Sequence, residues 1–181
     1  MNGRNAATRP FFTIGHSTRS IEDLAALLQS AGADLIVDVR KMPRSRTNPQ
    51  FNADNMSNAL RPWQIGYRHI ATLGGLRGRQ DSPKVSLNVA WQNKSFRNYA
   101  DYALTPAFKM GLSELRELGG THNCAIMCAE AVWWRCHRRI IADYLIAGGA
   151  TVLHILGPNA IKPAVLMPVA RTTPEGLIYD G

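Results

Sequence analysis

Residues 11–39 read FFTIGHSTRSIEDLAALLQSAGADLIVDV, and this stretch decides the fold. The apolar run from Phe11 to Gly15 predicts a first strand. Ser20 is placed to cap a helix, and apolar residues then recur at helical spacing from Ile21 to Ala31 before a glycine. The apolar, β-branched run from Ala33 to Val39 is typical of a strand that is buried on both faces. A strand, a helix and a strand in this order form a βαβ unit, which predicts parallel pairing.

The alternation of strands and helices continues along the chain. Further strands are predicted at Tyr67–Ile70, Cys124–Ala129 and Thr151–Leu156, and flanking prolines predict an edge strand at Pro163–Pro168. Helices are predicted from Asn52 or Asp54 to Leu60, at Ser95–Leu104, at Pro106–Leu118 before Gly119 and Gly120, and at Arg135–Ala147.

This pattern predicts one α/β domain over residues 1–181. We expect a mostly parallel open sheet of about five strands, with helices on both faces. Residues 1–10 are expected to be flexible. Residues 72–93 are polar and show little periodicity, so we expect them to form a long loop.

The composition excludes several classes of protein. The chain of 181 residues is 45% hydrophobic, which suffices for a buried core and excludes a disordered protein. No segment approaches the roughly 18 apolar residues of a membrane helix, and residues 1–10 contain no apolar secretory segment. Three cysteines are too few for a disulfide scaffold, which fits a reducing compartment. We therefore expect a cytoplasmic protein with no membrane partner.

The positive charge is concentrated in one part of the chain. The formal net charge is +8, and residues 38–97 account for all of it, with eleven lysines or arginines and three aspartates. Guanidinium groups form paired hydrogen bonds with phosphate or carboxylate. This pattern indicates a surface that faces a polyanion, while charges in loops can also serve solubility alone. The basic residues of that surface are Arg40, Lys41, Arg44, Arg46, Arg61, Arg68, Arg77 and Arg79.

Polar residues follow the predicted strands at the place where a parallel sheet binds its ligands. In an open α/β sheet, ligands bind outside the carboxyl ends of the strands, where the strand order reverses. The positive N-terminus of the helix that opens near Arg135 is expected to face the same crevice. The residues expected there are His16 and Ser17, Asp38 and Arg40, Cys128 and Glu130, and Cys136, His137 and Arg138.

The segment from Cys128 to Arg138 allows four interpretations. In a thiol phosphatase or sulfurtransferase loop, a cysteine and an arginine flank an anion cradle, but Glu130 would place a carboxylate inside that cradle. A metal site could use Cys124, Cys128, Cys136 and His137, but Cys124 and Cys128 would lie about 13 Å apart on one regular strand. The remaining two thiols and one imidazole need a further ligand.

The other two interpretations need no nucleophilic thiol. In a structural role, Cys136 is a small buried group, Glu130 caps the helix and His137 donates to a strand-end carbonyl. In an acid/base site, Glu130 and Asp38 share one crevice with arginines that hold a substrate phosphate.

Several separated motifs resemble the bacterial and archaeal family called "domain of unknown function 488". They are TIGHST at 13–18, DVR at 38–40, PRSR at 43–46, NPQFN at 48–52, LGG at 73–75, residues 96–102, CAE at 128–130 and CHR at 136–138. The resemblance implies a single α/β domain with a parallel sheet, and no established activity comes with it. Trp133 and Trp134 replace a more polar, proline-containing stretch of other members.

We expect an enzyme that acts on a phosphate-bearing substrate, either a nucleotide or a nucleic acid, at the strand ends. Its catalytic groups would be Glu130, Asp38 and His16. The phosphate would be bound by Ser17, Arg40, Arg44, Arg46, His137 and Arg138, while Cys128 and Cys136 would be structural thiols. No metal or cofactor is predicted, and the oligomeric state stays open. The alternatives are a non-catalytic nucleic-acid-binding or regulatory module, and a thiol or metal sensor.

Overall fold

The first three elements of the structure are those predicted from residues 11–39. They are strand β1 (Phe11–Gly15), helix α1 (Ile21–Ala31) and strand β2 (Leu35–Asp38). The Ser20 side chain accepts a hydrogen bond from the backbone of Asp23, and Gly32 ends the helix with a φ of 74°. The structure is a computed structural model and describes residues 9–81 and 85–181. It confirms the α/β class.

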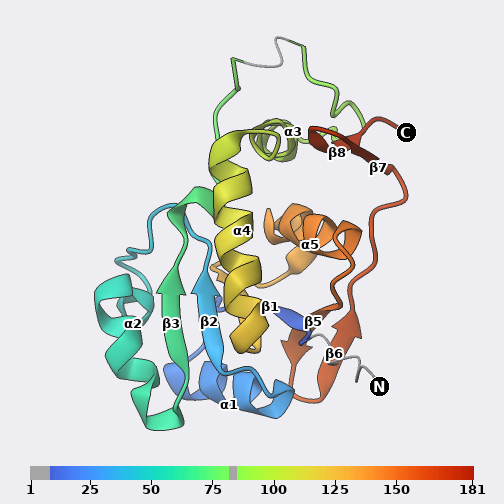
Figure 1. The fold of residues 1–181 in the computed structure, drawn as a ribbon. Helices are drawn as coiled ribbons and strands as arrows, with labels where there is room; N and C mark the ends of the chain where they lie inside the picture. The colour runs from blue at the N-terminus through green and yellow to red at the C-terminus, as the bar shows by residue number, and fades with distance from the viewer. Residues whose placement is uncertain (1–8, 82–84) are drawn as a thin grey trace, which may run out of the picture.

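The main sheet has six strands in the order β3-β2-β4-β1-β5-β6, one more than expected (Figure 1). The parallel part is completed by β3 (Gly66–His69), β4 (Cys124–Cys128) and β5 (Val152–Gly157). Strand β4 returns between β1 and β2, so the two strands of the βαβ unit are parallel to each other but both pair with β4. The carboxyl ends of three central strands therefore lie side by side.

Helices cover both faces of this sheet (Figure 1). Helices α1 and α2 (Ala53–Leu60) pack on one face, where they meet Phe12 and Ile14 of β1. Helices α3 (Lys94–Tyr102), α4 (Pro106–Thr121) and α5 (Arg138–Ala147) pack on the other face with Phe11. Successive side chains of a strand point to opposite faces, so one strand contributes to both clusters.

Three helices have boundaries that differ from the predicted ones. Helix α3 begins at Lys94 and ends at Tyr102, two residues before the predicted end at Leu104. Helix α4 continues through Gly119 and Gly120 to Thr121. The glycine at 119 serves packing rather than a helix stop, because a Cβ there would lie 2.2 Å from the ring of Phe11. Helix α5 begins at Arg138 rather than at 135, because residues 133–135 form a separate 3-10 turn.

The C-terminal strands also differ from the prediction. The edge strand is β6 (Ala160–Pro163), which pairs antiparallel with β5, and residues 164–168 are not part of it. A hairpin of β7 (Ala170–Thr173) and β8 (Gly176–Tyr179) was not predicted. It lies apart from the main sheet beside α3, where Leu177 and Tyr179 join the core (Figure 1).

The described residues between 74 and 93 form no helix or strand. This segment is held to the rest of the molecule through Asn88, whose side chain bonds to Asp101 and to the backbone of Tyr179. Residues 1–8, most of the segment expected to be flexible, lie outside the described residues. Within the described ranges, every helix is too short or too polar to cross a bilayer.

Candidate functional site

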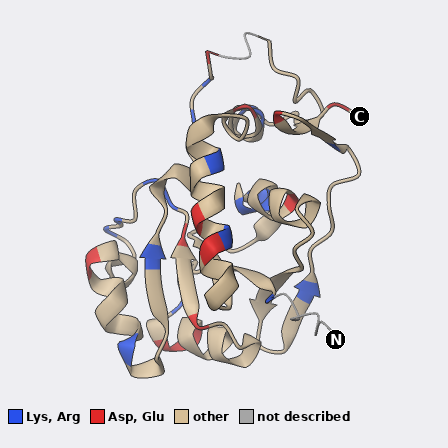
Figure 2. Cartoon of the chain, in the orientation of Figure 1, with Lys and Arg blue, Asp and Glu red and all other residues tan. Residues whose placement is uncertain are grey.

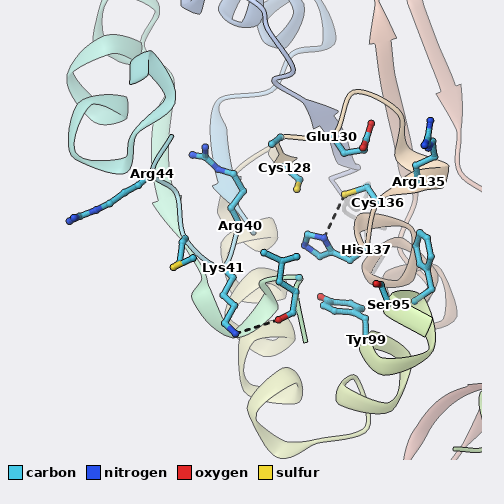
Figure 3. A pocket seen from close by; sticks show the side chains of 15 residues that line it. Arg40, Lys41, Arg44, Ser95, Tyr99, Cys128, Glu130, Arg135, Cys136 and His137 are labelled. Carbon is cyan, nitrogen blue, oxygen red and sulfur yellow. Dashed lines mark hydrogen bonds between the residues drawn. The ribbon is translucent and has the colours of Figure 1, made fainter. Parts of the chain in front are cut away.

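A pocket of about 540 Å³ opens at the carboxyl ends of β2 and β4 (Figure 3). Its walls come from segments that are far apart in the sequence: the loop after β2, the loop after β3, helix α3, and the segment that joins β4 to α5. The lining residues are Arg40, Lys41, Met42, Arg44, Gly75, Leu76, Ser95, Phe96, Tyr99, Cys128, Ala129, Glu130, Arg135, Cys136 and His137.

Backbone hydrogen bonds continue beyond the strands and hold these segments together. The N–H group of His16 donates to the carbonyl of Cys128 at 2.9 Å, and that of Ser17 donates to Ala129 at 3.0 Å. On the other side of β4, Val39 donates to Met127 at 3.0 Å. The segments after β1, β2 and β4 therefore share one rim.

Cys128, Cys136 and His137 line the pocket side by side (Figure 3). Their sulfur atoms and a ring nitrogen all lie within 4.8 Å of one another, and Sγ of Cys136 is 3.6 Å from Nδ1 of His137. Nε2 of His137 lies 2.9 Å from the carbonyl oxygen of Val39, which accepts its proton. Nε2 therefore carries a proton, and Nδ1 is the ring nitrogen that faces the sulfur of Cys136.

A buried arginine lies behind this group. Arg138 is only 1% exposed, and its Nε donates to Sγ of Cys136 at 3.2 Å while its Nη2 donates to the carbonyl of Glu130 at 2.5 Å. Within residues 9–81 and 85–181, no carboxylate forms an ion pair with Arg138. Burial opposes ionisation of Cys136, but Cys128, His137 and Arg138 together lower the pKa of its thiol well below the ordinary value.

The other thiol has the opposite tendency. Its interaction with Cys136 and its desolvation both raise the pKa of Cys128 well above its ordinary value. Of the two thiols, Cys136 is therefore the more acidic.

Asp38 is fully buried, and its carboxylate binds Arg40 and Tyr67. Arg40 donates from Nε at 2.9 Å, from Nη2 at 2.5 Å and from its backbone at 3.0 Å, and the Tyr67 hydroxyl donates at 2.7 Å. Burial tends to lower the pKa of Arg40, but the hydrogen bonds and charge of Asp38 outweigh it and raise this pKa. Burial and the same carboxylate raise the pKa of Tyr67, so its hydroxyl stays a donor.

His16 completes this buried network. Its ring is 1% exposed and stacks on Phe51 with the centroids 4.1 Å apart. Nδ1 lies 2.9 Å from the carbonyl oxygen of Ser17, and Nε2 lies 3.2 Å from Nη1 of Arg40. Burial lowers the pKa of His16 to about 4, and the neighbouring Arg40 cation acts in the same direction. His16 is therefore neutral at pH 7 and accepts from Arg40, whose guanidinium also donates to Phe51.

Charged side chains at the rim of the pocket are exposed. Glu130 lines the pocket with an exposed side chain, and Figure 3 shows Arg135 beside it. The loop after β2 carries several basic residues (Figure 2). Arg44 in this loop is 81% exposed, and its contact with Asp54 is long, at 3.8 Å. Arg46 is also exposed but does not line the pocket.

The structure brings only part of the predicted site into the pocket. Arg40, Arg44, Cys128, Glu130, Cys136 and His137 line it, whereas His16, Ser17, Asp38, Arg46 and Arg138 do not. His16 and Asp38 reach the pocket only through Arg40, and Arg138 reaches it through Cys136. This placement favours a positioning role for the three buried groups.

The wall of the pocket opposite the thiols was not predicted from the sequence. This wall consists of Leu76, Ser95, Phe96 and Tyr99, with Gly75 packed against His137. The available signals were the glycine pair in LGG at 73–75 and the two aromatic residues three positions apart on one helix face. Neither signal shows that these residues would face Cys128.

Comparisons with known proteins agree with the fold and the motifs. The family model described as "Domain of unknown function DUF488" matches residues 20–145, which is more than half of the chain. No curated protein and no solved structure matches the chain. The match covers the loop after β2, helix α3, and the segment with both thiols of the pocket. The chain therefore belongs to the DUF488 family, a family defined by a domain of unknown function.

Proposed function

We propose that this protein is an enzyme that binds a phosphate-bearing compound of nucleotide size in the pocket described above and acts on it beside Cys128. The observation that carries the proposal is that four cationic residues line one concave site. Lys41, Arg44 and Arg135 have exposed side chains on the pocket lining, and Arg40 forms part of its wall. Cations on the lining of a pocket favour an anionic ligand, and guanidinium groups favour phosphate.

The shape and the apolar wall favour a compact ligand with a flat group. Pockets for small molecules typically measure roughly 300–1,000 Å³, and this one is about 540 Å³. Phe96 and Leu76 lie on the wall, and Phe96 is itself stacked on Trp91 with the centroids 4.8 Å apart. A nucleobase would fit between such side chains because aromatic and apolar surfaces stack well on bases.

Glu130 is the acid/base candidate in the pocket. Glu130 lies on the pocket lining with an exposed side chain, while the other proposed carboxylate, Asp38, uses both oxygens within the protein. We assign the proton transfer to Glu130 and the fixing of Arg40 to Asp38 and His16. The rim arginines and Lys41 would hold the phosphate.

A binding experiment tests the first half of this proposal. The full chain is titrated calorimetrically with a panel of nucleoside mono- and diphosphates, inorganic phosphate and a single-stranded oligonucleotide. Arg135→Ala and Lys41→Ala should each weaken nucleotide binding about tenfold, because a hydrogen bond to a charged group contributes roughly 1.5–3 kcal/mol. Lys109→Ala and Lys162→Ala are matched controls on exposed positions outside the pocket and should bind as the parent does. Equal affinity in all four variants would exclude this pocket as the binding site.

A turnover experiment tests the second half. Each compound that binds is incubated with the protein, and the products are identified by mass spectrometry. Glu130→Gln should abolish turnover and leave binding and the far-UV circular dichroism spectrum unchanged. The alternative, a non-catalytic nucleic-acid-binding or regulatory module, rests on the exposed Arg44 and Arg46. It predicts preference for the oligonucleotide, loss of binding on substitution of these two arginines, and no product.

A further inference from the structure

We propose that Cys128, Cys136 and His137 bind a zinc ion whose fourth coordination position opens into the pocket. The three ligand atoms lie within 4.8 Å of one another without any ion present. Across residues 9–81 and 85–181, no other group of three histidine, cysteine or acidic side chains converges in this way. Thiolate and imidazole are the ligands that zinc prefers in proteins. The sequence alone predicted no metal, because these three residues lack a fourth protein ligand.

The spacing between the ligand atoms of Cys136 and His137 fits a tetrahedral site. With a Zn–S bond of about 2.3 Å and a Zn–N bond of about 2.05 Å, tetrahedral angles place sulfur and nitrogen about 3.6 Å apart. The distance between Sγ of Cys136 and Nδ1 of His137 is 3.6 Å. An ion would therefore be bound without a rearrangement of these two side chains.

His137 is oriented as a metal ligand would be. Histidine ligands usually donate their second ring N–H to a carbonyl or carboxylate, which fixes the tautomer and the ring plane. Here Nε2 donates to the carbonyl of Val39 at 2.9 Å, so Nδ1 is the ring nitrogen that would bind the ion. A glycine keeps the space beside that atom open, because a Cβ at Gly75 would lie 2.7 Å from Nδ1.

The charges around the site favour an anion at the fourth position. Two thiolates neutralise a divalent ion, and the buried Arg138, which donates to Sγ of Cys136, leaves the site with one net positive charge. Cys128 and His137 are partly exposed and line the pocket, so the open position faces the proposed substrate. Zinc sites with three protein ligands and one open position are typical of catalysis. The role of the ion in turnover rests on the proposed function, whereas the ion's binding does not.

Metal analysis of the full chain tests the site. The protein, purified without chelators, should contain one zinc per chain by mass spectrometry of the metal, and the Cys128→Ser and Cys136→Ser variants should contain less than a tenth of that amount. Cys124→Ala is the matched control, because its buried sulfur lies outside the cluster, and it should keep the full content. Protein loaded with cobalt should show thiolate-to-cobalt charge-transfer absorption and the bands of a tetrahedral ion.

A second pair of variants covers the case in which the cysteine variants misfold. Gly75→Ala removes no ligand but crowds Nδ1, and should weaken zinc binding roughly tenfold in competition with a chromophoric chelator. Gly78→Ala, where a Cβ would meet nothing within 4 Å, should bind as the parent does. Absence of zinc and of the cobalt spectrum from folded protein would overturn the inference, as would equal zinc content in the Cys136 and Cys124 variants.

The experiments above can refute the zinc site and the proposed function independently of each other. Stoichiometric zinc in a chain that binds no phosphate compound would support the metal site and refute the proposed function, and would then favour a metal sensor. Nucleotide binding that depends on Arg135 in a chain that binds no zinc would refute the metal site and leave the proposed function in place.

Discussion

Replacing Asp38 with asparagine removes the negative charge at the centre of the buried network beneath the pocket. Asp38 is fully buried and Arg40 is 8% exposed, so neither group can be solvated in place of its partner. The amide of asparagine would turn one N–H donor towards the guanidinium, which is itself a donor. Arg40 would remain charged, buried and only partly hydrogen-bonded.

The expected loss of stability is large. Removing one partner of a buried ion pair costs about 3–5 kcal/mol, because the remaining charge loses its compensation. Domains are stabilised by only about 5–15 kcal/mol in total. With a urea dependence of about 2 kcal/mol per molar, the unfolding midpoint should fall by about 1.5–2.5 M.

Urea unfolding followed by tryptophan fluorescence measures this loss. The matched control is Asp54→Asn, which breaks the contact with Arg44 at 3.8 Å, where both side chains are about four-fifths exposed. An exposed pair of this kind contributes about 0–1 kcal/mol, so the control should hardly move the midpoint. If Asp38→Asn also cost less than about 1 kcal/mol, the network would not anchor Arg40, and the positioning role assigned to Asp38 would be wrong.

Two further predictions concern stability. Gly119→Ala should lower the free energy of unfolding by about 1–3 kcal/mol, because its Cβ would overpack against β1. Gly120→Ala, where a Cβ would meet nothing within 4 Å, should raise it by about 0.5 kcal/mol. Thermal melting should therefore show shifts of opposite sign, and equal shifts would contradict the packing argument. Burial lowers the pKa of His16 and His154 to about 4, from an ordinary value of 6.5. Between these two pH values the unfolded chain binds protons that the folded chain does not, so the free energy of unfolding decreases as the pH falls. Asp143, with its pKa raised by burial to about 6, acts in the opposite sense and offsets part of this loss. The net loss between pH 7 and pH 5 should be about 2–3 kcal/mol in urea titrations, and an unchanged midpoint would show that the histidines are not buried as neutral groups.

Much of the fold follows from local patterns. The spacing of apolar residues in α1 and the unbroken apolar run of β2 depend on neighbours in the sequence, and both elements formed as predicted. The hairpin of β7 and β8 was missed because β7, with the sequence ARTT, is polar and short, and its pairing brings Leu177 and Tyr179 to a core made by distant helices. The glycine pair in α4 was misread as a stop because only the approach of β1 explains Gly119.

The candidate site was likewise predictable in part from local patterns and in part only from the tertiary structure. The sequence by itself determined that His16, Asp38, Arg40, Cys128 and Glu130 follow strands of one parallel sheet, because strand ends are marked by a local change from apolar to polar residues. Only the tertiary structure decided which of these side chains face the pocket and which are consumed inside the protein. The direction of a side chain depends on packing and on hydrogen bonds with partners many residues away, such as Tyr67 for Asp38 or Val39 for His137, and no local pattern encodes those partners.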